Sequence, residues 1–539
     1  MALVEQTINS QRIRIEKIEL QNFRGVSNGI VEFNCLKTPI GNETSSDILG
    51  LYGQNGSGKT TLLDALRIAK RAMMGKQIPY DMFGSIISQD SDHARMTISF
   101  QVMKSNGEVY HLEYAFSLGK WEIAPDNSGK KVNSKSIATV AGLSVMSTAV
   151  PAMTLVTAMG LGPVAIAASA AGIVASQIIK SSNTGKEVLQ SDGKTHRLVI
   201  FDEVLSLSGT FDGTSIRLAP IFDTRTDETV FLPKAKQKAF FPSKTAAVLK
   251  ELQSKKKQCL VNSESFIFCD ALSQLIIEQG QISAYAQIIV DLKAFAISNM
   301  WVLANKVRNS AGEEVIPLFT ANKRIPISKS DSTTYLTNDG LKSLQTALNA
   351  LNVVLQQIIP GLTLEAVRQV DIDLNDRNAK AHATRTKVVV YSVRDNVRIP
   401  IGEESAGIIR LISSLGLLSF AFVNPSVTVA IDEIDAGVYE YLLGELLLIF
   451  EEYGSGQLIF TCHNLRPMEV LNKKYIYFTT TNPNNRYLKP KSIRNENNLR
   501  DVYLREIIMG GQEEDLYTAA KHGKIASAMQ KAGDLIGKE

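Results

Sequence analysis

The sequence predicts an α/β protein in which a mixed sheet is flanked by helices and interrupted by an apolar insertion and by a larger helical insertion. Three observations support this fold class. A glycine-rich loop at residues 53–60 joins an apolar strand to an amphipathic helix, and a second apolar strand ends at Asp432 and Glu433. Between residues 387 and 464, strands alternate with helices, which is typical of a parallel sheet with crossover helices.

Composition places the chain among globular proteins. Hydrophobic residues make up 44% and charged residues 21% of the 539 residues, which excludes the disordered and collagen-like classes. The net charge of +4 is too small to indicate a nucleic-acid ligand, because that inference needs basic residues clustered on one surface.

The four cysteines are Cys35, Cys259, Cys269 and Cys462, and they form no C-x-x-C pair. No histidine stands at zinc-finger spacing from them, so the sequence predicts neither a disulfide framework nor a structural zinc site. Residues 1–17 contain no apolar run of the kind found in secretory signals. Both features are typical of a cytoplasmic protein, and we expect this location.

Each predicted element in the N-terminal part has its own signal. Residues 13–23 alternate apolar and charged side chains, as a half-buried strand does. Leu62, Leu66 and Ala69 mark the buried face of the helix that follows the glycine-rich loop. Residues 95–118 predict an antiparallel hairpin that turns at Asn106 and Gly107, because Asn-Gly favours a tight hairpin turn.

Farther along, the pattern predicts a helical stretch over about residues 240–357, broken by a Pro/Thr/Ser-rich linker at 317–336, before the strands and helices of the C-terminal part. The chain therefore divides into one α/β unit split by two insertions. The predicted boundaries are 1–125 (N-terminal lobe), 126–195 (uncharged apolar insertion), 196–235 (return to the lobe), 236–340 (α-helical insertion) and 341–539 (C-terminal lobe and tail).

Residues 53–60, GQNGSGKT, have the G-x-x-x-x-G-K-T pattern of a phosphate-binding loop. Glycines allow successive backbone N–H groups to face a phosphate at the start of a helix. Lys59 would supply a charge to the β and γ oxygens, and the Thr60 hydroxyl would bind Mg²⁺. The residues predicted to contact the nucleotide are Asn55, Gly56, Ser57, Gly58, Lys59, Thr60 and Thr61.

Asp432 and Glu433 follow four apolar residues of five and so stand at the carboxyl end of a strand, where open parallel sheets place their ligands. Asp432 is predicted to hold Mg²⁺, and Glu433 to polarise the attacking water as general base. His463 ends the next strand, where it would reach a γ-phosphate. Ser405 begins a helix, and such a helix N-terminus is either an ordinary cap or a phosphate-binding surface.

Taken in order, these motifs resemble the ATPase head of the ABC/SMC/RecF group. The matching segments are IEKIELQNFRG (15–25), the Walker A loop (53–60), a divergent signature (405–407), VAIDEIDAG (429–437) for Walker B and D-loop, and His463 for the H-switch. The resemblance covers about residues 10–125, 196–235 and 341–490. It implies an ABC-ATPase-type P-loop NTPase fold that uses ATP and Mg²⁺.

The same resemblance implies a homodimer, or a higher oligomer, that closes around ATP. Ser405 and Gly407 of one chain would contact the γ-phosphate held by Lys59 of the other, and Asp435 would cross the interface. Arg24 would lie near the base or sugar. The Q-loop glutamine, a further metal ligand beside Thr60 and Asp432, is Gln89 or Gln101, and we favour Gln89.

Within this group the chain resembles AAA-family ATPases of prokaryotic anti-phage systems, such as the Septu and retron subunits and the heads of overcoming-lysogenization-defect nucleases. LNALNVVLQQIIPGL and NNLRDVYLREIIMGGQEEDLY carry this resemblance. It implies a regulatory ATPase that acts with a separate effector, a nuclease or toxin, because the stretch after His463 is too short for a Toprim nuclease domain. The alternative is a RecF-like or SMC-like head that repairs or clamps DNA.

Two segments have unusual charge. Residues 136–179 hold no charged side chain, which is compatible with a packed helical hairpin, a membrane-active element or a disordered loop. Residues 250–257 carry a basic cluster that is either a solvated face or a contact to the phosphate backbone of DNA or RNA. The lysines of this cluster are Lys250, Lys255, Lys256 and Lys257.

Overall fold

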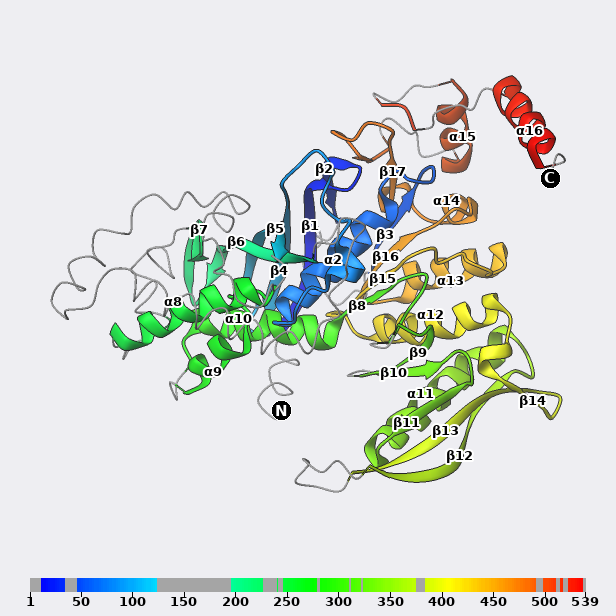
Figure 1. Ribbon diagram of the computed structural model, residues 1–539, viewed down its shortest axis with the longest axis horizontal. Coiled ribbons are helices and arrows are strands. Elements are labelled where there is room, and N and C mark those ends of the chain that lie inside the picture. Colours follow the sequence, from blue (N-terminus) through cyan, green and yellow to red (C-terminus); the bar gives the residue numbers. More distant parts are fainter. Residues whose placement is uncertain are drawn as a thin grey trace, which may run out of the picture.

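The computed structural model describes residues 11–33, 46–123, 195–225, 240, 246–278, 282–309, 312–320, 323–374, 383–490, 498–509, 514–516 and 522–536. Figure 1 shows an antiparallel sheet beside a parallel sheet, with a smaller α/β lobe at the far end of the latter. The predicted α/β class, a mixed sheet flanked by helices, is confirmed. The uncharged stretch 136–179 lies outside the described residues.

The central sheet has the strand order β18-β17-β3-β16-β15-β8, and all neighbours from β17 to β8 are parallel. Its carboxyl ends therefore share one edge, as expected from the alternation of strands and helices. Its strands are β3 (Asp47–Tyr52), β8 (Met300–Leu303), β15 (Thr428–Ile431), β16 (Gln457–Thr461), β17 (Ile476–Thr479) and the antiparallel β18 (Tyr487–Leu488).

The second sheet is antiparallel, in the order β2-β1-β4-β5-β6-β7. The hairpin predicted at Asn106 and Gly107 is present between β4 and β5. The strands are β1 (Gln11–Phe23), β2 (Val26–Glu32), β4 (His93–Lys104), β5 (Val109–Ile123), β6 (Thr195–Phe211) and β7 (Thr214–Asp223). A first hydrophobic core joins this sheet to the helices α2 (Lys59–Met73), α9 (Asp270–Glu278) and α10 (Ala284–Ala294), and it also receives residues of α8 (Ala246–Val261).

The described part of region 236–340 corrects the prediction of a helical insertion. The helical stretch ends with a short π-helix, Phe295–Asn299, and strands follow from Met300 onward. The apolar run through these residues fits a buried helix or a buried strand equally well from its pattern alone. Pairing decides the matter, because β8 lies parallel to β15 in the central sheet.

The smaller lobe follows β8 and leads to α12 (Ala406–Val423). One face of its sheet packs against α11 over a third core that includes Leu344, Leu348 and Val390. The lobe consists of β9 (Val315–Thr320), β10 (Lys323–Ser328), β11 (Thr333–Leu336), α11 (Asn338–Ile358), β12 (Thr363–Leu374), β13 (Ala383–Arg394) and β14 (Val397–Pro400). The remaining helices are α3 (Tyr80–Phe83), α13 (Glu440–Tyr453), α14 (Arg466–Val470), α15 (Leu499–Met509) and α16 (His522–Ile536), with 3-10 turns at Ile401–Glu403 and Lys473–Tyr475.

A buried polar network ties the two large sheets together at the end opposite the carboxyl edge. Arg14 of β1 pairs with Asp47 of β3 at 2.9 Å and donates to the carbonyls of Pro425 and Ser455. The amide of Gln457 exchanges two hydrogen bonds of 2.8 Å with the backbone of Ile15. The charged pair is thus satisfied on several sides, as a buried charge requires.

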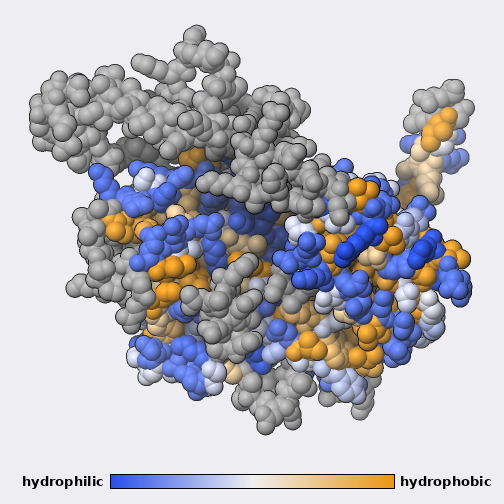
Figure 2. All heavy atoms as spheres, turned by 90° about the horizontal axis from the view of Figure 1, so that it is seen from below, coloured by the Kyte–Doolittle hydropathy of each residue, from blue (hydrophilic) through white to orange (hydrophobic). Residues whose placement is uncertain are grey.

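α12 is the single described helix that is long and apolar enough to cross a bilayer. It packs against α11, β9 and β15, and 44% of its apolar window is buried within the fold. Figure 2 shows that hydrophilic and hydrophobic residues are interspersed over the face of the molecule that is seen from below.

The buried charge of Lys70 in α2 lowers the stability of the folded protein. Burial, and then the nearby charge of Arg324, lower the pKa of Lys70 from 10.5 to about 8. Below pH 8 the folded protein therefore carries a destabilising charge, and between pH 8 and 10.5 the unfolded chain binds more protons, so stability rises with pH. We expect Lys70→Met to raise the free energy of unfolding at pH 7 by about 1–3 kcal/mol and to flatten this rise.

Denaturant unfolding at pH 7, 9 and 10 measures both effects. Lys342→Met, at an exposed position of α11, is the matched control and should change neither. Equal unfolding free energies of Lys70→Met and the original protein at pH 7 would contradict the assignment.

Candidate nucleotide site

The glycine-rich loop between β3 and α2 has the backbone of a phosphate cradle. Gly53 has φ 154° and Gly58 has φ 93°, and both lie against neighbouring groups. A Cβ on Gly53 would meet the Thr479 hydroxyl at 1.8 Å, and one on Gly58 would meet Val26 at 2.9 Å. Only glycine fits these two positions, because other residues avoid positive φ and need the occupied space.

Lys59 lies folded over this loop. Its ammonium donates to the carbonyl of Gly53 at 2.7 Å and to that of Gln54 at 3.0 Å. Burial lowers the pKa of Lys59, while the carboxylates of Asp432, Glu433 and Asp435 oppose this change. The lysine therefore stands in the field of the carboxylates that follow β15.

The other predicted loop residues differ in accessibility. Asn55 and Gly56 are exposed at the tip, whereas Ser57 is buried and donates to the carbonyl of Gln54 at 2.7 Å. Thr61 is buried in the first turn of α2. Asn55 and Gly56 are thus open to a ligand, whereas Ser57 holds the loop in shape through its hydrogen bond to Gln54.

Thr60 and Asp432 meet across the site. The Thr60 hydroxyl donates to Oδ1 of Asp432 at 3.3 Å, although the two residues are 372 positions apart. The Thr461 hydroxyl, at the end of β16, donates to the same Oδ1 at 2.7 Å and accepts from the backbone N–H of Glu433 at 2.7 Å. Thr461 fixes both carboxylate residues and was not among the residues predicted from sequence.

Glu433 has a strained backbone, with φ 48°, and its Oε2 accepts a short hydrogen bond from Nδ2 of Asn305. Asn305 follows β8, which neighbours β15 in parallel, so the two side chains stand at the same sheet edge. Among the hydrogen bonds of the described residues, Asn305 is the side-chain amide that bonds to a carboxylate at the end of β15.

Gln89 and Gln101, the two predicted Q-loop residues, lie elsewhere. Gln89 is exposed in a turn that follows the bridge between Phe23 and Ile87. Gln101 lies within β4 and pairs with Arg14 of β1. Among the described residues, neither glutamine forms a hydrogen bond with Thr60 or Asp432, whose hydroxyl and carboxylate bond to each other.

Arg410 joins α12 to the site. Its guanidinium donates to the carbonyl of Ala304 at 3.1 Å and to that of Asp432 through a short bond. Burial lowers the pKa of Arg410, and the nearby carboxylates oppose this. The helix that begins at Ser405 is thereby fixed to the ends of β8 and β15, which sequence reasoning did not anticipate.

Ser405 and Gly407 lie at the start of α12. Ser405 is exposed, and its hydroxyl accepts from the backbone N–H of Ile408 at 3.3 Å as the helix cap. A Cβ on Gly407 would lie 2.1 Å from the carbonyl oxygen of Gly437. Within one chain, Gly407 therefore has a packing reason for being glycine, and Ser405 is the residue left open to solvent.

The residue before the cap is anchored. Glu404 accepts from the Ser392 hydroxyl at 2.5 Å and from Arg394 at 3.0 Å, and its side chain is 6% exposed. β13 of the smaller lobe thus sets the position of the exposed serine.

Asp435 also acts within its own chain. Its Oδ2 accepts from the backbone N–H groups of His463 and Asn464, at 2.9 and 2.8 Å. This contact binds the turn after β15 to the turn after β16, and the His463 side chain remains exposed.

Arg24 pairs with Asp64 of α2 at 2.8 Å. Its backbone has φ 48°, and its N–H donates to the carbonyl of Ile86 at 2.8 Å. The arginine therefore flanks the first turns of α2, one helical turn beyond Thr60.

The donors at the site suit Mg²⁺. No group of three or more His, Cys, Asp or Glu side chains able to hold a metal occurs among the described residues. The carboxylate and hydroxyl of Asp432 and Thr60 instead supply hard oxygen ligands, and Mg²⁺ commonly takes its remaining ligands from phosphates and water. The donor set fits a metal that arrives with a nucleotide.

Residues 17–135 match the AAA domain family, a match that includes the later part of β1. The matched segment also holds the glycine-rich loop and the helix that follows it, α2. No curated protein matches the chain.

Three of the solved structures that are similar to the chain illustrate the match. The Smc head domain of Pyrococcus furiosus with an extended coiled coil, bound to the C-terminal domain of ScpA, is 12% identical over 88% of this chain and 96% of that chain, with a TM-score of 0.31. The SMC head domain from Thermotoga maritima is 11% identical over 89% and 100%, also at 0.31. The recombination mediator protein RecF is 12% identical over 88% and 98%, at 0.31.

Proposed function

We propose that the protein binds and hydrolyses Mg-ATP at the site between the glycine-rich loop and the carboxyl edge of the central sheet. The observation that carries this proposal is the contact between Thr60 and Asp432. It joins a hydroxyl and a carboxylate from distant parts of the chain beside Lys59, which is the donor arrangement that a metal-bound triphosphate needs.

Each residue has a separate task in this proposal. Lys59 would leave the loop carbonyls to bind the β and γ oxygens. Thr60 and Asp432 would hold Mg²⁺, which would supply positive charge beside the phosphates. Glu433 accepts a proton from the attacking water. His463, exposed at the end of β16, donates to the γ-phosphate.

Phosphate release from ATP tests this function. We expect release by the purified protein to require Mg²⁺ and to stop with EDTA. Lys59→Ala should remove ATP binding, because it deletes the cation of the cradle. Release that persists both in EDTA and in Lys59→Ala would show that another site or a contaminant is responsible.

We propose Asn305 as the amide ligand expected of the Q-loop, in place of Gln89. Asn305→Ala should lower phosphate release about 10–100-fold, the usual effect of losing a residue that orients a metal site. Asn305→Gln, which restores the amide, should recover most of it. The matched variant Gln89→Ala should retain full activity, and the reverse pattern would return the role to Gln89.

We further propose that two copies close around ATP, with Ser405 of one chain facing the nucleotide of the other. Support comes from the exposure of Ser405 and from the anchoring of Glu404 and Arg410, which holds the start of α12 rigid. Asp435 and Gly407 would join this interface next to their contacts within the chain. Ser405→Arg should prevent the ATP-dependent increase in mass seen by light scattering.

For the biological role we propose a cytoplasmic ATPase that regulates a separate nuclease or toxin in anti-phage defence. The RecF-like or SMC-like alternative, in which the dimer clamps DNA, fits the fold equally. Co-purification of an effector would favour the first role, and DNA binding without any partner would favour the second. The three described cysteines, Cys259, Cys269 and Cys462, are free thiols, which suits a reducing compartment.

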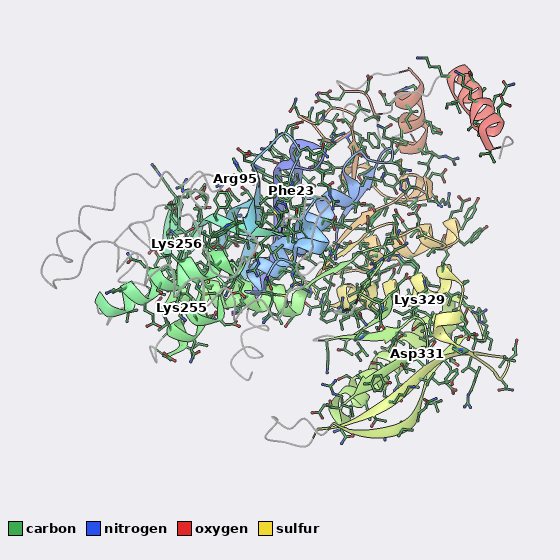
Figure 3. All side chains as sticks on the ribbon, in the orientation of Figure 1. Phe23, Arg95, Lys255, Lys256, Lys329 and Asp331 are labelled. Atoms are coloured by element: carbon green, nitrogen blue, oxygen red, sulfur yellow. The ribbon has the colours of Figure 1, made fainter. Side chains whose placement is uncertain are left out.

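The lysine cluster of α8 is a proposed contact for DNA or RNA. Figure 3 shows Lys255 and Lys256 on α8, on the same side of the molecule as Arg95. Lys256 donates to the carbonyl of Thr224 at 2.6 Å and so has a structural task, whereas Lys250 and Lys257 are exposed. The paired charge reversal of Lys250 and Lys257 should therefore weaken salt-dependent nucleic-acid binding without unfolding the helix.

A further inference from the structure

Arg67, Lys70 and Arg324 gather on the flank of α2. Arg67 and Lys70 are three residues apart on this helix and so share a face. The ammonium of Lys70 lies 4.5 Å from the centre of the Trp301 ring, and that ring packs edge-on against Phe319 at 5.5 Å. Phe319 is the cross-strand partner of Arg324, which places Arg324 on the same side.

This cation cluster contains too few acids to balance it. Arg67 pairs with Asp64 at 2.9 Å, but Asp64 also pairs with Arg24. Lys70 donates to the carbonyl of Met300 at 2.5 Å. In the described part of the chain, no carboxylate forms an ion pair with Lys70 or Arg324. Of the three cations, Arg67 is therefore the one with an ion pair among the described residues, and it shares that carboxylate with Arg24.

The cluster carries an electrostatic cost. Burial and then Arg67 lower the pKa of Arg324, just as burial and then Arg324 lower the pKa of Lys70. Repulsion of this kind destabilises a fold, and titratable groups perturbed in this way cluster at functional sites. Arg324 lies near the start of β10, where part of its side chain remains exposed, so an anion in solution has access to it.

We propose that Arg67, Lys70 and Arg324 form a second anion site, which binds adjacent phosphate groups of one ligand. Guanidinium groups bind phosphate oxygens in pairs, and an ammonium adds a point charge. The site is separate from the glycine-rich loop, because a rise of 1.5 Å per residue puts Arg67 and Lys70 about 12 and 17 Å along α2 from Lys59. The phosphates come from a free polyphosphate or from a nucleic-acid backbone.

Calorimetric titration with tripolyphosphate tests the site. The original protein should show two binding events. Lys59→Ala should lose the event at the glycine-rich loop, and Arg324→Glu should weaken the other at least tenfold. Lys342→Glu, an exposed charge reversal on α11, should change neither event.

The outcomes separate this site from the proposed ATP site. If the loop binds no phosphate, Lys59→Ala changes nothing and Arg324→Glu removes the single event. Two unchanged events in Arg324→Glu, or no binding at all in Lys59→Ala, would overturn the second site. A labelled 20-nucleotide strand, about long enough to span such a site, identifies the source. Binding lost in Arg324→Glu assigns the backbone, and binding of tripolyphosphate alone assigns a free polyphosphate.

Thermal unfolding gives an independent readout. In the Lys59→Ala background, tripolyphosphate should raise the melting temperature, since a ligand that binds only the folded state stabilises it. Adding Arg324→Gln should raise the melting temperature without ligand, because repulsion is relieved, and should abolish the ligand-induced rise. A ligand-induced rise that survives Arg324→Gln would contradict the proposal.

Discussion

Glu433→Gln is expected to lower phosphate release from ATP by about 10²–10⁴-fold, the contribution usual for a general base, while ATP binding is retained. The substitution keeps the shape of the side chain and an oxygen that accepts from Asn305. It also leaves the hydrogen bond from the Glu433 backbone to Thr461. Binding and geometry are thus preserved, and only proton acceptance is removed.

The same variant should accumulate as an ATP-bound dimer, because closure no longer ends in hydrolysis. Light scattering with ATP and with ADP measures this accumulation. Glu445→Gln, on the exposed face of α13, is the matched control and should behave like the original protein. Unchanged hydrolysis together with no shift in mass would rule out the proposed mechanism.

Arg14→Met is expected to destabilise the protein by about 3–5 kcal/mol, the cost of leaving a buried charge without its partner. Arg14 and Asp47 are 3% and 6% exposed, so water cannot replace the lost bonds. Burial already raises the pKa of Asp47 against the opposing charge of Arg14, and removing Arg14 raises it further.

The sign of the pH dependence follows from this shift. A carboxyl whose pKa is raised on folding holds its proton in the native state at pH values where the unfolded chain has lost it, so stability falls as pH rises above 3.8. Chemical unfolding should therefore show a smaller loss for Arg14→Met near pH 4 than at pH 7. Adding Asp47→Asn should recover part of the loss at pH 7. Equal stability of Arg14→Met and the original protein would show that the buried Arg14–Asp47 network does not stabilise the fold.

The sequence was sufficient to predict the parts of the site that depend on neighbouring residues. The glycine-rich loop is recognisable because Gly53, Gly58 and Lys59 occupy fixed positions between a strand and a helix. Asp432 and Glu433 are recognisable because they end a buried strand. In both cases the pattern that predicts the site lies within about ten residues.

Asn305, Thr461 and Arg410 could not be found in this way. Their importance arises from strand order, since β8 and β16 flank β15 and bring Asn305 and Thr461 to the edge where Glu433 stands. Arg410 looks like an isolated cation in an apolar helix until its two carbonyl partners are known. β8 itself was predicted as helix, because four apolar residues have no period that separates strand from buried helix.

A crystal structure of Glu433→Gln with ATP and Mg²⁺ tests the central claim most directly. The claim predicts a triphosphate along residues 53–60 with Lys59 on its β and γ oxygens. It also predicts a metal bound by the Thr60 hydroxyl, with Asp432 and Asn305 beside it. A nucleotide bound elsewhere, or a metal held without Thr60 and Asp432, would contradict it.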